Sequence, residues 1–190
     1  MKSVADYVQQ ARKGEHTRSG IILGIRLAIV GLNELVIEEP REHRRRLVVI
    51  VETDRCLPDA IELVTGCRLG NRTLKFKDMG KMAATFADLK TGRAVRVAAR
   101  ESANQSAREM SPSLTKEEAL ERAYSVLQDD DVFTRRLVNV SLAPEDIPGY
   151  AAPRVMCDDC EESIAFGREL IEGQRTLCRS CGGDGYLDSR

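Results

Sequence analysis

Two Cys-x-x-Cys pairs near the end of the chain most constrain how it can fold. The first pair is Cys157 and Cys160, the second is Cys178 and Cys181, and 17 residues separate the pairs. This spacing lies within the range for four-thiolate zinc sites. Because four sulfurs complete the tetrahedron that Zn²⁺ prefers, no position stays open for a substrate. The spacing therefore predicts a closed, structural zinc site.

Two other uses of these cysteines have to be weighed: a pair of disulfides, or a redox-active Cys-x-x-Cys. Residues 157–181 contain few apolar side chains and would need a cross-link or a metal to order themselves. The chain shows no signal-peptide pattern, and its longest apolar run, residues 21–30, contains Gly24 and Arg26 and is too short for a membrane span. We therefore expect a cytoplasmic protein with no membrane contact, where thiols serve as metal ligands more readily than as disulfides.

The charge of the C-terminal segment bears on its partners. Residues 154–190 contain five arginines and eight acidic residues, and a zinc ion held by four thiolates would add two further negative charges. Nucleic-acid-binding zinc modules depend on a basic face, because neutralising phosphates supplies most of their affinity. The composition thus disfavours a zinc ribbon that binds nucleic acid.

Upstream of the cysteine pairs, apolar periodicity predicts a mixture of helices and strands. Residues 19–35 are apolar nearly all the way round a helix, which predicts a buried central helix, and its glycines indicate a close packing neighbour. The expected helices are residues 2–13, 19–35, 59–65 and one that begins after Ser113 or Thr115. The expected strands are residues 47–51, 74–77, 83–88, 93–99 and 137–142, with a turn at 90–92. The polar residues 101–113 are expected to form a loop.

This order of elements predicts an α+β fold: a central helix against a mixed or antiparallel sheet. A proline-containing stretch that ends near Pro153 is typical of a linker. We expect a core domain of residues 1–148, followed by the linker and a small four-cysteine finger in residues 149–190.

Cys56 and Cys67 form a second candidate site, at the two ends of one strand–helix unit. Asp54 and Asp59 flank the first of them. Loops that follow a buried strand often carry functional residues. Equally, free cysteines are commonly small buried hydrophobic residues, so spacing alone leaves both interpretations open.

Five ordered blocks resemble the E-subunit family of formylmethanofuran dehydrogenase. The blocks are GIILGIRLA (20–28), ETDRCLPDA (52–60), TGCRLG (65–70), LKFKDMGK (74–81) and GRAVRV (92–97). The resemblance implies an α+β core, commonly dimeric, in methanogens and other anaerobes, with a treble-clef-like finger in many members. Because the residues after Cys181 are rich in glycine, we expect the helix of such a finger to be short or absent, leaving a treble-clef-like or ribbon finger.

The resemblance also implies a metal site in the core. His16, Cys56 and Cys67 match the family ligands, but Arg18 stands where the family has a cysteine. Three ligands plus water make a workable open zinc site, whereas a guanidinium cannot coordinate and repels a cation. The core is therefore a candidate for a second metal, the alternative being a polar cleft that has lost its metal.

These observations give two functional hypotheses. The first is a zinc-binding accessory or regulatory protein of the E-subunit type, forming a homodimer or joining a larger oxidoreductase. The molybdenum or tungsten chemistry of that system belongs to other subunits, and the cysteine spacing of this chain matches no iron–sulfur pattern. The second is a metal-dependent enzyme with an open His16, Cys56 and Cys67 zinc site, in which Asp54, Asp59 or Lys81 would transfer protons.

Overall fold

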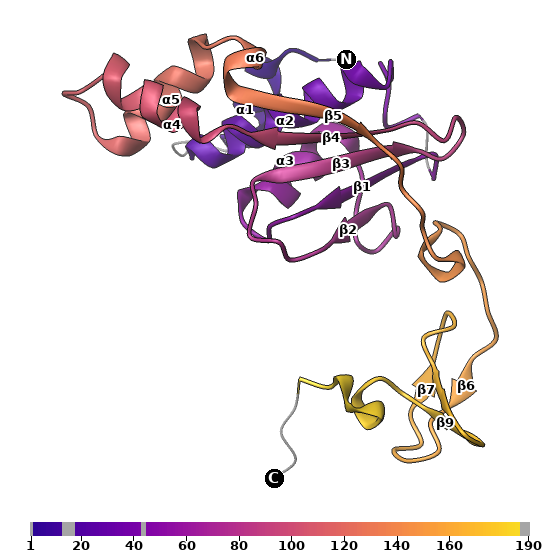
Figure 1. The fold of residues 1–190 in the computed structure, drawn as a ribbon. Coiled ribbons are helices and arrows are strands. Elements are labelled where there is room, and N and C mark those ends of the chain that lie inside the picture. Colours follow the sequence, from indigo (N-terminus) through magenta and orange to yellow (C-terminus); the bar gives the residue numbers. More distant parts are fainter. Residues whose placement is uncertain (1, 13–17, 43–44, 187–190) are drawn as a thin grey trace. The chain divides into compact units, whose positions relative to one another are not determined.

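The computed structural model of the chain describes residues 2–12, 18–42 and 45–186. The chain divides into two compact units, Met1–Val140 and Ser141–Arg190. Each unit has its own cluster of buried apolar side chains, and the two clusters share no residue. The larger unit contains helices and a sheet, whereas the smaller one is built from short hairpins (Figure 1).

The larger unit is the expected α+β fold. Its helices are α1 (Val4–Ala11), α2 (Ser19–Glu34), α3 (Cys56–Thr65), α4 (Glu101–Met110), α5 (Lys116–Val126) and α6 (Asp129–Val132). Its strands are β1 (Leu47–Val51), β2 (Leu74–Phe76), β3 (Ala83–Asp88), β4 (Ala94–Ala99) and β5 (Phe133–Val138).

The five strands form one mixed sheet in the order β2-β1-β3-β4-β5. Strands β1 and β2 run parallel, and every other neighbouring pair is antiparallel. The apolar run of β1 is buried except at Ile50, which is half-buried, as expected of a strand inside the sheet. Strands β3 and β4 form the expected hairpin, in which the N–H of Gly92 donates to the carbonyl of Asp88.

Helix α2 is the buried central helix that its composition predicts. It packs against α3 and against strands β3 and β4. A Cβ added at Gly24 would lie 2.6 Å from the Cβ of Ala60, and one added at Gly31 would lie 2.3 Å from the Phe86 ring. Glycine is therefore required at both places for α2 to approach α3 and the sheet this closely.

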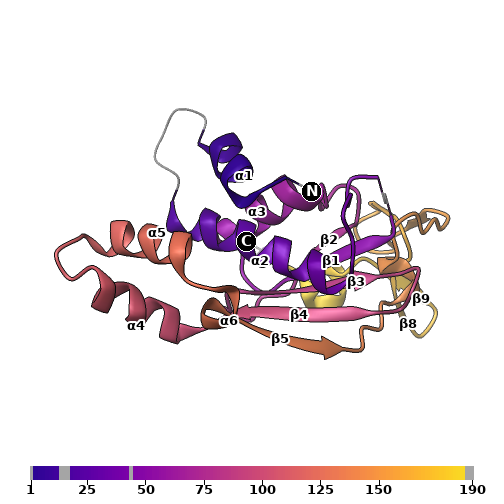
Figure 2. The ribbon, with the colours of Figure 1, turned by 90° about the horizontal axis from the view of Figure 1, so that it is seen from above.

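The expectation of a loop at residues 101–113 is wrong, because most of this segment forms α4. Its apolar face is reduced to Ala103 and Ala107, one turn apart and both buried, too small a stripe to stand out in the sequence. The helix packs along α5, and in both ribbon views the two extend beyond one end of the sheet (Figures 1 and 2). Strand β5 also begins four residues before the expected strand and ends at Val138.

In residues 141–186, the part of the smaller unit that the structure describes, there are two β-hairpins and two short helical turns. The hairpins pair β6 (Val155–Met156) with β7 (Ser163–Ile164) and β8 (Leu170–Glu172) with β9 (Arg175–Leu177). A 3-10 turn covers Pro144–Asp146, and a five-residue helical turn covers Ser180–Asp184. As expected, the glycines after Cys181 keep this last helix short: Gly183 has φ of 87°, which ends regular helical geometry.

Within the part of the chain that the structure describes, no helix is long and apolar enough to cross a lipid bilayer.

Candidate metal centre and core cleft

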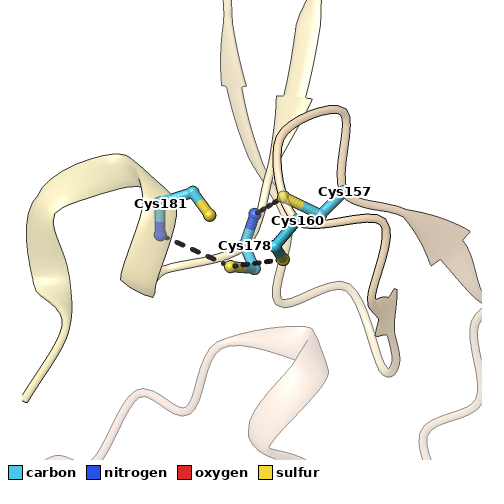
Figure 3. Close-up of side chains that lie close together, drawn as sticks. All are labelled: Cys157, Cys160, Cys178 and Cys181. Atoms are coloured by element: carbon cyan, nitrogen blue, oxygen red, sulfur yellow. Dashed lines mark hydrogen bonds between the residues drawn. The ribbon is translucent and has the colours of Figure 1, made fainter. Parts of the chain in front are cut away.

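The four cysteines of the smaller unit converge on one point (Figure 3). The sulfur atoms of Cys157, Cys160, Cys178 and Cys181 all lie within 4.8 Å of one another. Those of Cys160 and Cys178 are 3.8 Å apart. A tetrahedron of sulfurs around zinc, with Zn–S bonds of about 2.3 Å, has edges of about 3.8 Å. The arrangement fits a four-thiolate metal site.

Each Cys-x-x-Cys pair is positioned by a hairpin. Cys157 follows β6 and Cys178 follows β9, while the second cysteine of each pair lies in the turn after its strand. The N–H of Asp158 donates to the carbonyl of Thr176 at 2.8 Å, and the N–H of Thr176 donates to the Asp158 carboxylate at 2.6 Å. These two hydrogen bonds hold the hairpins side by side.

Backbone N–H groups of the turns point at the sulfurs. The N–H of Cys178 donates to Cys157 Sγ at 3.2 Å, and the N–H of Cys181 donates to Cys178 Sγ at 3.4 Å. Donation by the N–H groups of Cys160 and Cys178 lowers the pKa of Cys157 to about 7. Hydrogen bonds of this kind stabilise metal-bound thiolates.

The thiols of Cys160 and Cys181 do not ionise as easily when no cation is near, because the pKa of each is raised. The neighbouring sulfurs of Cys178 and Cys160 raise the pKa of Cys181 to about 12. Four thiolates this close repel one another, and a bound divalent cation is the usual compensation.

All six cysteines carry free thiols in the structure. The buried apolar cluster of the smaller unit consists of Cys157, Ile164 and Leu177 alone among the described residues. A core this small cannot hold such a unit together unaided, which accords with a stabilising metal.

The candidate residues of the core do not form a second such site. Cys56 begins α3 and Cys67 follows the end of that helix, and ten helical residues rise about 15 Å. Two sulfurs bound to one zinc ion lie only about 4 Å apart. Cys56 and Cys67 therefore cannot share an ion, and His16 lies outside the described residues.

Cys67 fits the alternative interpretation of the free cysteines, that of a small buried hydrophobic residue. It is 4% exposed, and its thiol lies 3.6 Å from the carbonyl oxygen of Leu47, at the start of β1. Burial raises the pKa of the Cys67 thiol, which keeps it protonated.

Cys56 instead lines a cleft of about 1,040 Å³ in the larger unit. Its walls come from the first turns of α2 and α3, the residues just before β3, the strand β4 and the helices α4 and α5. The sequence-predicted residues Asp54, Asp59 and Lys81 line this cleft as well, and so does Arg18. The structure thus brings together four of the polar residues that the sequence singled out around Cys56.

Helices α4 and α5 form a wall that contributes Glu101, Asn104, Lys116, Glu117 and Tyr124. Helix α5 is the helix expected to begin after Ser113 or Thr115, and a capping box formed by Thr115 and Glu118 starts it. Sequence reasoning missed the part of the wall that α4 forms, because residues 101–113 were expected to be a loop.

Two hydrogen bonds fix this wall. The backbone N–H of Ser19, at the start of α2, donates to a carboxylate oxygen of Glu117 at 2.5 Å. The hydroxyl of Tyr124 donates to the side-chain oxygen of Asn104 at 2.8 Å. Burial raises the pKa of Tyr124 to about 12, with smaller contributions from the nearby carboxylates of Glu101 and Glu117. Tyr124 is therefore a neutral hydrogen-bonding group at this end of the cleft.

Known proteins resemble both units. Residues 15–139 match the family described as FmdE, Molybdenum formylmethanofuran dehydrogenase operon. An FmdE-like protein of Syntrophus aciditrophicus, named for the E-subunit of a tungsten formylmethanofuran dehydrogenase, has a similar solved structure. It aligns with a TM-score of 0.63 and 28% sequence identity, over 98% of this chain and 96% of that one.

A second relative is similar over a shorter stretch. A protein of Archaeoglobus fulgidus, named a probable S-adenosyl-L-methionine-binding protein, is 35% identical over 79 residues. The match covers 40% of this chain and 22% of the length of that protein. The match of most of the larger unit to the family described above, together with the similar fold of a solved relative, shows that this chain belongs to the FmdE family.

Proposed function

We propose that this chain is a zinc-binding accessory or regulatory protein of the FmdE family, with a structural zinc site in its smaller unit and a ligand cleft in its larger unit. The observation that carries the zinc site is the convergence of four cysteine sulfurs within 4.8 Å. Four thiolates leave no open coordination position, so the ion would stabilise the fold and would not act on a substrate.

The alternative of a metal-dependent enzyme loses its principal support. That hypothesis needs Cys56 and Cys67 on one ion, and α3 separates them. The larger unit retains a cleft with polar walls around Cys56, which supports a role in binding a small ligand.

Partnership with other proteins is part of this proposal. A relative of the same fold is named for one component of a tungsten formylmethanofuran dehydrogenase, although the name describes that protein alone. We accordingly propose a cytoplasmic protein that forms a homodimer or associates with a larger oxidoreductase. Light scattering of the purified chain would give its mass in solution directly.

Metal analysis tests the zinc site. The full-length protein should contain one zinc ion per chain, whereas a Cys157→Ser/Cys178→Ser variant should contain none. Cys67→Ala serves as the matched control, since its sulfur is buried beside Leu47 in the larger unit and is not one of the four clustered sulfurs, so its removal should leave the zinc content unchanged. Zinc retained at one per chain in the double variant would contradict the proposal.

A further inference from the structure

The core cleft differs from a cation site in the charges that line it. Its described walls contain six cationic side chains and four carboxylates. Arg18, which stands at the start of α2, and Arg55, which stands at the start of α3, are among the cations. A guanidinium stays charged at every physiological pH and cannot bind a metal. The residues present therefore do not fit a divalent ion.

Four of these cations have no ion-pair partner within the described residues. They are Arg18, Arg55, Lys81 and Lys116. Lys81 does contribute to lowering the pKa of Glu52, but the Glu52 carboxylate already accepts two hydrogen bonds from Arg96, at 2.6 and 2.7 Å. Unpaired guanidinium and ammonium groups in one concave site are the arrangement that binds oxyanions.

Two of the four carboxylates of the cleft come from α4 and α5. Glu117 is held by the backbone N–H of Ser19, and Glu101 accepts a hydrogen bond from Asn104. The other two, Asp54 and Asp59, lie in the chain on either side of Arg55 and Cys56. Hydrogen bonds from neutral donors leave all four carboxylates charged. Arg96 is paired with Glu52, which does not line the cleft, so the other five cations of the described walls exceed the four carboxylates by one and leave an excess of positive charge.

We propose that this cleft binds the oxyanion group, phosphate or carboxylate, of a small organic ligand between Arg18, Arg55 and Lys81. The volume of about 1,040 Å³ is that of a site for a small molecule, and Tyr124 and Asn104 offer it a neutral polar contact. The inference rests on the proposed role of the larger unit as a ligand cleft and names its ligand class.

Cys56 provides a reporter within the cleft. Its side chain is half-buried, and a Cβ added at Gly20 would lie 3.2 Å from its sulfur, so the thiol lies against the first turn of α2. Anionic iodoacetate and neutral iodoacetamide both alkylate the same thiolate, releasing iodide as the S–C bond forms. The ratio of their rates at Cys56, measured by peptide mass spectrometry on the zinc-loaded full-length protein, thus reports the local charge independently of ionisation.

The charge variants should move this ratio in opposite directions. Arg18→Gln should lower the ratio of iodoacetate to iodoacetamide rates, by as much as about fivefold if the charge acts at a contact distance of roughly 4 Å in water. Arg55→Gln provides a second variant in case the first disturbs the start of α2. Asp54→Asn should raise the ratio. Arg108→Gln, at an exposed position of α4 outside the cleft, is the matched control and should leave it unchanged.

Occupancy is tested with two simple anions, inorganic pyrophosphate and citrate. Either should slow the alkylation of Cys56 by iodoacetamide in the natural chain, and less so in Arg18→Gln. Protection by pyrophosphate alone would indicate a phosphorylated ligand, and protection by citrate alone a carboxylate ligand. Failure of both anions to protect Cys56, or an unchanged rate ratio in every cleft variant, would overturn the inference.

The zinc content of the same samples separates this result from the proposed function. One zinc per chain without protection of Cys56 would contradict the oxyanion site and support the zinc site. Absence of zinc in the natural chain would contradict the zinc site, whatever the labelling shows.

Discussion

Val36 has a backbone conformation that is unfavourable for its own side chain. Helix α2 ends in a Schellman motif, in which the N–H of Ile37 donates to the carbonyl of Leu32 and the N–H of Val36 to that of Asn33, both at 3.0 Å. The motif places Val36 at φ of 57°, where glycine is the usual residue and a β-branched side chain is strained. Because Val36 is 74% exposed, its packing does little to offset that strain.

Val36→Gly should therefore stabilise the protein, by about 1 kcal/mol, since it relieves the left-handed conformation and exposes little buried surface. Denaturant unfolding of the larger unit would show this as a higher midpoint with an unchanged slope. Val36→Ala retains a Cβ and should gain less. An equal or lower midpoint for the glycine variant would show that the turn carries no such strain.

At the residue scale the cysteine pairs were predictable and the core site was not. The spacing of a Cys-x-x-Cys motif places two thiols on one turn. The four sulfurs therefore converge wherever two such turns lie side by side. Cys56 and Cys67 are close in the sequence, but the ten-residue helix that begins at Cys56 rises about 15 Å before the chain reaches Cys67. Their separation depends on where α3 begins, at Cys56 and not near Asp59 as expected.

At the scale of elements, the hairpin of β3 and β4 depends on one buried carboxylate. Asp88, whose side chain is 1% exposed, accepts two hydrogen bonds from Arg46, both at 2.6 Å. It also accepts from the N–H of Lys90 and the hydroxyl of Thr91, within the turn. These donors, the Arg46 guanidinium first, hold the pKa of Asp88 well below its usual range.

Asp88→Asn should destabilise the protein by about 2 to 4 kcal/mol at pH 7, because it leaves Arg46 without its buried partner. The lowered pKa means that the stabilisation is fully present above the unfolded value of about 3.9 and declines as the pH falls further below it. The difference between the natural chain and the variant in free energy of unfolding should thus shrink below about pH 4.

Asp130→Asn is the matched control for this effect, since its pair with Arg135 lies on the surface, with 82% of the Asp130 side chain exposed. It should change stability little at any pH. A difference for Asp88→Asn that stays constant from pH 7 to pH 3 would show that the Asp88 carboxylate is not the group responsible.

The elements that could be predicted are those whose large apolar side chains mark a buried face in the sequence. The apolar residues of α2 and β1 are large and periodic, so their positions followed from the sequence. Helix α4 buries only alanines, and its stability comes from packing on α5 and from hydrogen bonds such as the one from Gln105 to Glu109. The sequence alone therefore did not predict that α4 lines the cleft.

At the scale of the whole molecule, the two units depend on different forces. The larger unit buries a continuous cluster that includes α1, α2, α3 and the sheet, whereas the smaller unit buries three side chains among those described. Apolar burial can stabilise the first alone. The proposed metal, held by the four cysteines, would supply the stability that burial cannot give the second.

Removal of zinc should accordingly unfold the smaller unit and spare the larger one. Treatment of the full chain with a strong chelator, with metal loss verified, should expose residues 155–183 to limited proteolysis while the larger unit keeps its cooperative thermal transition. A chain ending at Val140, the end of the larger unit, provides the control and should melt at the same temperature with and without chelator. If cleavage of the zinc-stripped smaller unit is no faster than before, its fold does not depend on the metal.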